Sequence, residues 1–267
     1  MKRLVLLLTI LIGFGGIAHS YENTYALIVG VADYKYEGII SDLNYTVKDA
    51  KSFYSFLIKP EGGSVPKENI CVLLDTMATK KNIMRNAKAL FSKANANDRV
   101  IFYFSGHGGK GFFCPYDFNG YVDKALTYDD VKTIFRNAKS NTKLMFADAC
   151  HSGGIKKGTV QAKETDSTEN SNMNIAIMLA CSDDEMSGEG SELEHGLFTY
   201  YLMKGLGGAA NRDGNKYITI QELYYYVYAH VKEKSEKMKY KDGQVHIQTP
   251  QLFGNFDLRI IVGNVVE

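Results

Sequence analysis

The sequence predicts an α/β fold: a three-layer α-β-α sandwich on a mostly parallel sheet of about six strands, with helices on both faces. Three observations predict it. Apolar runs of strand length alternate with segments whose apolar residues recur at helical spacing, an order typical of parallel sheets. The apolar runs are continuous, as in strands buried on both faces. The chain has 267 residues, 45% of them apolar, which fits one large domain.

The elements begin at residue 25. The first strand is residues 25–31 (YALIVGV), and the first helix is residues 43–58, which stops before Pro60. Two later helices have clear start signals, Thr127 before two acidic residues and Thr219 with Glu222 in a capping box. Other helices are expected from Thr79 and over residues 197–206, and residues 111–116 predict a short hairpin. The remaining predicted strands are residues 70–74, 100–105, 142–147, 175–181 and 258–262.

Two segments fall outside this alternation. Residues 1–20 combine Lys2 and Arg3 with an apolar run and a small-residue site ending at Ser20, which predicts a secretory signal peptide. We expect an exported, bacterial protein, in the periplasm, at the cell surface or secreted, whose single domain spans residues 21–267 without a membrane span. An uncleaved anchor is the alternative reading. Residues 155–174 are polar, cannot build a core, and are predicted to form a mobile loop within the domain.

Charge and cysteine usage exclude some functions. The 31 basic and 30 acidic residues give a net charge of +1, which argues against a nucleic-acid-binding surface. The four cysteines, Cys71, Cys114, Cys150 and Cys181, show neither a CxxC pair nor zinc-ligand spacing. We predict one reactive thiol and three structural thiols.

The reactive thiol is predicted at Cys150. Cys150 and His107 each lie in a turn of small residues directly after an apolar strand, 43 residues apart. If these strands are neighbours in a parallel sheet, both turns meet at its carboxyl edge, where the sites of α/β proteins lie. A cysteine with a histidine about 50 residues upstream is typical of caspase-type peptidases.

These segments resemble the caspase-like peptidases, closest to the metacaspases and bacterial orthocaspases. YFSGHGG is similar to their histidine block, DACHSGG to their cysteine block, and CSDDEMSGE with GLFTYYLMKGL to the segment after their fifth strand. The resemblance runs from Tyr25 to about Leu206. It implies a caspase-like fold and a cysteine endopeptidase in which Cys150 is the nucleophile and His107 the base. The backbone N–H groups of Gly108 and Cys150 are the expected oxyanion donors. His151 is a weaker candidate base, because a residue adjacent to the nucleophile points its side chain elsewhere.

The resemblance and the charges also predict specificity. Caspases that cut after aspartate have a glutamine two residues before the nucleophile, whereas this chain has Asp148. LNYTVKDA resembles a metacaspase segment with a second acid, which points to Asp49. Two carboxylates in a partly buried pocket require a cation, so the expected substrates are proteins or peptides with Arg or Lys before the scissile bond. The alternative reading makes Asp148 a turn cap and Asp49 part of a solvated helix face.

No cofactor is required by this chemistry, and no metal ligands are assigned, although calcium is left open. Residues 211–222 have acid or amide groups at EF-hand positions 1, 3 and 5 and Glu222 at position 12, but Lys216 replaces the glycine. Calcium-dependent metacaspases use acids at a site resembling Asp129 and Asp130. A further acid expected after their cysteine block is missing here, with Lys157 nearby.

Two other functions stay open: a binding or scaffold protein with a weak caspase-fold site, and a legumain-like or gingipain-like peptidase of other specificity. We also expect self-cleavage in the loop 155–174, which offers Lys156, Lys157 and Lys163 to a site that prefers basic residues.

Overall fold

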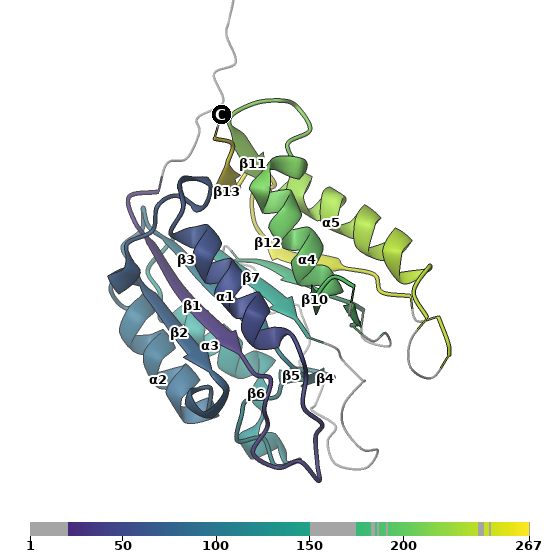
Figure 1. The fold of residues 1–267 in the computed structure, drawn as a ribbon. Coiled ribbons are helices and arrows are strands. Elements are labelled where there is room, and N and C mark those ends of the chain that lie inside the picture. Colours follow the sequence, from purple (N-terminus) through teal and green to yellow (C-terminus); the bar gives the residue numbers. More distant parts are fainter. Residues whose placement is uncertain are drawn as a thin grey trace, which may run out of the picture.

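The computed structural model describes residues 21–149 and 175–266, apart from residues 183, 184, 186, 191, 240–242 and 246. The predicted signal peptide, Cys150 and the loop 155–174 therefore lie outside the described residues. The described residues are built around a six-stranded sheet with the order β12-β8-β7-β3-β1-β2 (Figure 1). Its strands are β1 (Thr24–Gly30), β2 (Ile70–Leu74), β3 (Arg99–Ser105), β7 (Thr142–Asp148), β8 (Ile175–Leu179) and β12 (Gln251–Asn255).

All strands of this sheet are parallel except β12, which runs antiparallel to β8. Helices α2 (Lys80–Phe91) and α3 (Tyr128–Arg136) cover one face, and α1 (Thr46–Leu57), α4 (Leu197–Lys204) and α5 (Ile220–Ser235) cover the other (Figure 1). Successive residues of one strand point to opposite faces, so Leu27 joins the core under α2 and Ile28 the core under α1. The predicted three-layer sandwich is confirmed.

The predicted helix starts hold closely. Thr79, Thr127 and Thr219 each cap a helix by accepting a hydrogen bond from a backbone N–H, and the last two form complete capping boxes with Asp130 and Glu222. A cap of this kind contributes about 1 kcal/mol to helix stability. Helix α4 continues into a π-helical turn, Gly205–Ala209. Among the described residues, the short 3-10 helices are Pro60–Gly62, Lys67–Asn69, Asp75–Met77 and Val122–Lys124.

The prediction for the last strand of the main sheet was wrong. Residues 258–262 do not join it; the sixth strand is β12, whose Phe253 is 43% exposed. A half-exposed edge strand lacks the continuous apolar run that marks the central strands, and for this reason β12 was not predicted from the sequence pattern. The C-terminal strand β13 (Ile261–Asn264) pairs instead with β11 (Tyr217–Thr219) in a separate two-stranded sheet.

Besides the β11–β13 sheet, two further small sheets lie beyond the main strands in the described residues. The predicted hairpin near residue 111 is part of a three-stranded sheet of β4 (Gly108–Gly109), β5 (Phe112–Phe113) and β6 (Leu126–Thr127). Strands β9 (Glu189–Gly190) and β10 (His195–Gly196) form an antiparallel pair that precedes α4. The described cysteines, Cys71, Cys114 and Cys181, form no disulfide with one another. None of the described helices combines the length and apolarity that a membrane crossing needs.

Candidate active site at the carboxyl edge of the sheet

Strands β3 and β7 end side by side at one edge of the sheet, and each is followed in the sequence by one of the two predicted catalytic residues. The strands are parallel neighbours, and Ser105 at the end of β3 is in register with Asp148 at the end of β7. His107 and Cys150 each follow two residues after this pair. The prediction that their strands are adjacent is confirmed. Cys150 itself lies outside the described residues, as does His151.

The His107 side chain is held in one orientation. It is 6% exposed, and its Nε2 lies 2.8 Å from the carbonyl oxygen of Ser41. Because a carbonyl only accepts hydrogen bonds, Nε2 carries the proton, and Nδ1 of a neutral ring is left as the acceptor. The backbone N–H of His107 donates to the Tyr34 hydroxyl at 2.7 Å, and the Tyr34 ring lies against the imidazole, 5.3 Å between centroids.

Burial lowers the pKa of His107 below its ordinary value. The Ser41 carbonyl and the charges of Glu189 and Asp42 act in the opposite direction, but more weakly. A lowered pKa keeps the imidazole neutral near pH 7, with an unprotonated Nδ1. This is the state that a general base requires before it takes a proton.

The amide of Gly108 has the geometry expected of a donor to a bound group. The backbone N–H of Cys114 donates to the carbonyl of His107 at 2.9 Å, and the next residue pair is Gly108 with Phe113. In an antiparallel ladder, hydrogen-bonded and non-hydrogen-bonded pairs alternate. The N–H of Gly108 is therefore directed away from β5.

Asp148 ends β7 as a buried carboxylate, 6% exposed. Its Oδ2 accepts hydrogen bonds from the backbone N–H and the hydroxyl of Thr199, at 2.9 and 2.8 Å, and its Oδ1 accepts one from the Ser187 hydroxyl at 2.8 Å. Burial raises the pKa of Asp148 to about 7, and the negative charge of Asp49 adds to the rise. The group therefore titrates in the physiological range.

Asp49 lies on the buried face of α1 and is 1% exposed. Nδ1 of His195 lies 2.5 Å from its Oδ1, while the Gly196 N–H and the Ser105 hydroxyl donate to its Oδ2, each at 3.2 Å. Burial raises the pKa of Asp49, and its hydrogen bond and charge interaction with His195 oppose that rise.

The two carboxylates converge on one glycine. A Cβ atom at Gly196 would lie 2.3 Å from Oδ2 of Asp148 and 3.1 Å from Oδ2 of Asp49. Neither acid therefore lies on a solvated face, and we call this pair with its ligands the paired-carboxylate site. When both of these buried acids are charged they repel each other, so a cation bound beside them would stabilise their charged forms.

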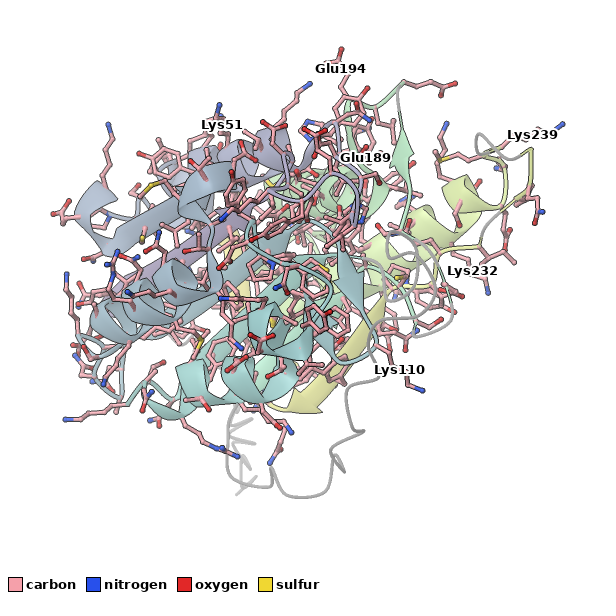
Figure 2. The ribbon with its side chains drawn as sticks, turned by 90° about the horizontal axis from the view of Figure 1, so that it is seen from below. Lys51, Lys110, Glu189, Glu194, Lys232 and Lys239 are labelled. Atoms are coloured by element: carbon pink, nitrogen blue, oxygen red, sulfur yellow. The ribbon has the colours of Figure 1, made fainter. Side chains whose placement is uncertain are left out.

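The β9–β10 pair is tied to the start of α1 by acidic side chains. Glu189 accepts hydrogen bonds from the backbone N–H groups of Asn44 and Tyr45, at 3.1 and 2.9 Å, and Glu194 forms an ion pair with Lys48. Figure 2 shows Glu189 and Glu194 on the same side of the molecule. His195 follows these two acids in the sequence, directly before Gly196 and α4, and its Nδ1 contacts Asp49. This contact places His195 and Gly196 against the acid on α1.

Sequence reasoning missed several residues of this edge. Thr199 lies in GLFTYYLMKGL, a segment used only as part of the resemblance, and His195 directly precedes that segment. Tyr34 follows the first strand at the same edge. Gln248 is fully buried and donates from Nε2 to the Ala180 carbonyl at 3.0 Å and to the Ser187 hydroxyl at 3.3 Å. Position after a strand could have singled out Tyr34, but no local pattern marks Gln248.

The residues considered for calcium have other partners. Glu222 caps α5 with Thr219 and accepts from the Arg212 N–H, and Asp213 accepts from Asn215. Asp130 forms an ion pair with Lys80, and Asp129 forms one with Lys132. Within the described part of the chain, no group of three His, Cys, Asp or Glu residues could hold a metal ion.

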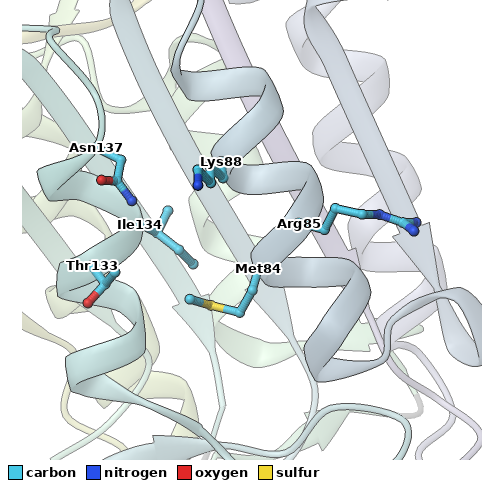
Figure 3. Close-up of a pocket in the computed structure, with 6 residues that line it drawn as sticks. All are labelled: Met84, Arg85, Lys88, Thr133, Ile134 and Asn137. Carbon is cyan, nitrogen blue, oxygen red and sulfur yellow. The ribbon is translucent and has the colours of Figure 1, made fainter.

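A shallow groove lies elsewhere, between α2 and α3 (Figure 3). None of its residues is a predicted site residue. The lining consists of Met84, Arg85, Lys88, Thr133, Ile134 and Asn137. We do not assign the chemistry of the carboxyl edge to it.

Comparisons with known proteins bear on the family and the fold of this chain. The sequence profile of the caspase domain matches residues 23–256. Metacaspase-4 of Arabidopsis thaliana is 29% identical over 150 residues, 49% of this chain and 34% of the plant protein. Metacaspase-1 of Debaryomyces hansenii is 29% identical over 169 residues, 53% of this chain and 37% of the yeast protein. The crystal structure of caspase-1 from Spodoptera frugiperda has the same fold, with a TM-score of 0.67, 12% identity and 92% of each chain covered.

Proposed function

Because the chain belongs to the caspase-domain family, a family of cysteine peptidases, we propose that it is a cysteine endopeptidase with a His107/Cys150 dyad. The observation that supports the proposal is the register of β3 and β7: their last residues, Ser105 and Asp148, are paired, and His107 and Cys150 each follow two residues later in the sequence. The matched segments span only about a third of the metacaspases, so the activity is inferred for this chain from its own site.

The catalytic steps follow from the His107 tautomer. Nδ1 accepts the proton of the Cys150 thiol, and the thiolate attacks the scissile carbonyl carbon. The resulting oxyanion accepts hydrogen bonds from the N–H groups of Gly108 and Cys150. Protonated His107 then gives its proton to the leaving amine, and a thioester remains. Water, deprotonated by His107, hydrolyses the thioester and restores the thiol.

We propose that the paired-carboxylate site selects substrates with Arg or Lys before the scissile bond. Asp49 and Asp148 are both buried and converge on Gly196, so a bound guanidinium or ammonium group would relieve their mutual repulsion. An acidic substrate side chain would add a third negative charge to this region. Charge thus supports basic over acidic specificity.

The same specificity supports self-processing. Lys156, Lys157 and Lys163 follow Cys150 closely in the sequence. We expect wild-type protein to be cut in the segment 155–174 and the Cys150→Ala protein to remain intact there, as mapped by mass spectrometry of the termini. Equal cutting of both proteins would assign the cleavage to another protease, and an uncut, fully active wild type would remove self-processing from the proposal.

The test is hydrolysis of fluorogenic peptides with Arg, Lys, Asn or Asp before the reporter. We expect cleavage of the Arg and Lys peptides, none by Cys150→Ala, a loss of orders of magnitude in His107→Ala, and most activity retained in His151→Ala. Cleavage after Asn would favour a legumain-like specificity. A folded wild type that cleaves none of the four peptides would contradict the proposal in favour of a binding or scaffold role.

A further inference from the structure

His195 stands between the surface and the buried acid of α1. Its side chain is 18% exposed, while that of Asp49 is 1% exposed. The imidazole Nδ1 lies 2.5 Å from Oδ1 of Asp49, on the opposite oxygen from the Gly196 and Ser105 donors. Oδ1 of Asp49 is therefore already hydrogen-bonded to His195, and a basic side chain that enters from solvent must replace His195 to bind this oxygen.

Charged groups lie around His195 on three structural elements. On α1 it faces Asp49, with Lys48 one residue earlier in an ion pair with Glu194. On the β9–β10 pair, Glu194 interacts with the His195 charge, and Glu189 lies on the partner strand, opposite Gly196. On β7, Asp148 lies behind Gly196. Acidic groups thus outnumber the single lysine among these neighbours.

We propose that His195 is the internal cation of the paired-carboxylate site, which holds Asp49 in the empty enzyme and competes with the basic side chain of the substrate. The inference rests on the proposed function, because it presupposes that the site takes a cation. When neutral, His195 only donates a hydrogen bond to Asp49. When protonated, it neutralises Asp49, and the substrate must displace it. At acidic pH the site then binds basic residues more weakly than it would if only the carboxylates titrated.

The paired carboxylates give a second, separate contribution to the pH dependence. Asp148 also loses its charge in acid, since burial raises its pKa to about 7. Binding of a cation is therefore linked to the release of protons from both His195 and Asp148. Each linked proton changes the affinity by up to about tenfold per pH unit. Removal of the His195 titration alone leaves the Asp148 contribution in place.

The experiment measures the Kd of benzamidine, a small amidinium compound, from pH 8 to pH 5.5. The parent protein is Cys150→Ala, which avoids self-cleavage, and the variant adds His195→Asn. The asparagine amide can donate to Asp49 from the place of Nδ1 but cannot gain a proton. The matched control is Lys48→Ala, which removes the exposed ion pair to Glu194 from the same pair of strands but leaves Asp49 alone. His195→Gln serves as a second variant, and far-UV circular dichroism checks the fold of each.

We expect the parent and Lys48→Ala to lose affinity in acid with the same steep dependence, and His195→Asn to lose it less steeply, by up to about tenfold per pH unit. Binding by His195→Asn where the parent binds nothing would also support the proposal. Identical pH dependence in the parent and both folded His195 variants would overturn it and leave the proposed basic specificity standing. Absence of benzamidine binding in all the folded proteins at every pH would overturn both.

Discussion

Asp148 should destabilise the fold near neutral pH as a consequence of its place in the site. Burial and the charge of Asp49 raise its pKa from the ordinary 3.8 to about 7, so the native state holds this proton more tightly than the unfolded state. The stability from this group is fully present below about pH 4 and is lost as pH rises through about 7. The loss is on the order of 4 kcal/mol, at about 1.4 kcal/mol for each tenfold difference in proton affinity.

The substitution Asp148→Asn removes this titration and keeps the shape. The asparagine Oδ1 can still accept from the N–H and hydroxyl of Thr199, and its Nδ2 can donate to the Ser187 hydroxyl. Urea unfolding at pH 4.5, 6, 7 and 8, in the Cys150→Ala background, gives the free energy of unfolding of both proteins. We expect the free energy of unfolding of the variant, relative to that of its parent, to increase steadily up to about pH 7. Parallel curves for the two proteins would refute the reasoning.

Three further substitutions test the surroundings of Asp148. Gly196→Ala places a Cβ atom 2.3 Å from Asp148 Oδ2, so we expect a loss of about 1–3 kcal/mol in unfolding free energy and a raised KM for Arg peptides. Gly207→Ala is the neutral control, because nothing lies within 4 Å of its Cβ position. Gln248→Ala removes the side-chain partners of the Gly188 N–H and the Ala180 carbonyl, so the unfolding free energy measured in urea should fall by about 1–3 kcal/mol for each buried group. An unchanged urea midpoint would contradict a stabilising role for Gln248. Thr199→Val removes a hydrogen-bond donor to Asp148, so the pKa of Asp148 should rise and the KM for Arg peptides should reach its minimum at higher pH than in wild type. An unchanged pH profile of KM would argue against the hydrogen bond between Thr199 and Asp148.

The central layers could be predicted from the sequence because each buried strand leaves a strong local pattern. Residues 25–31 and 144–147 are continuous apolar runs, and they lie in β1 and β7, the two neighbours of β3. The edge strand β12 leaves no such run, because half of it faces solvent and Gly254 replaces an apolar side chain. The prediction failed there for this reason, and it moved the sixth strand to residues 258–262.

The acids of the site were predictable from position, but their partners were not. Asp148 ends a buried strand, and Asp49 follows Thr46 and precedes Phe53 on the buried stripe of α1. His195 meets Asp49 across 146 residues of chain, and Gln248 meets Ser187 across 61. Contacts of this kind depend on how β10 and the segment before β12 pack against the sheet edge. No spacing within one segment carries that information.

The most direct measurement of the central claim is covalent labelling with peptidyl chloromethyl ketones that carry either Arg or Asp before the reactive group. Peptide mapping by mass spectrometry locates the adduct, and its rate of formation reports recognition. The account predicts one adduct, on Cys150, that forms faster with the Arg reagent and is slowed by His107→Ala and by Asp148→Asn. An adduct confined to another cysteine, or faster labelling by the Asp reagent, would contradict it.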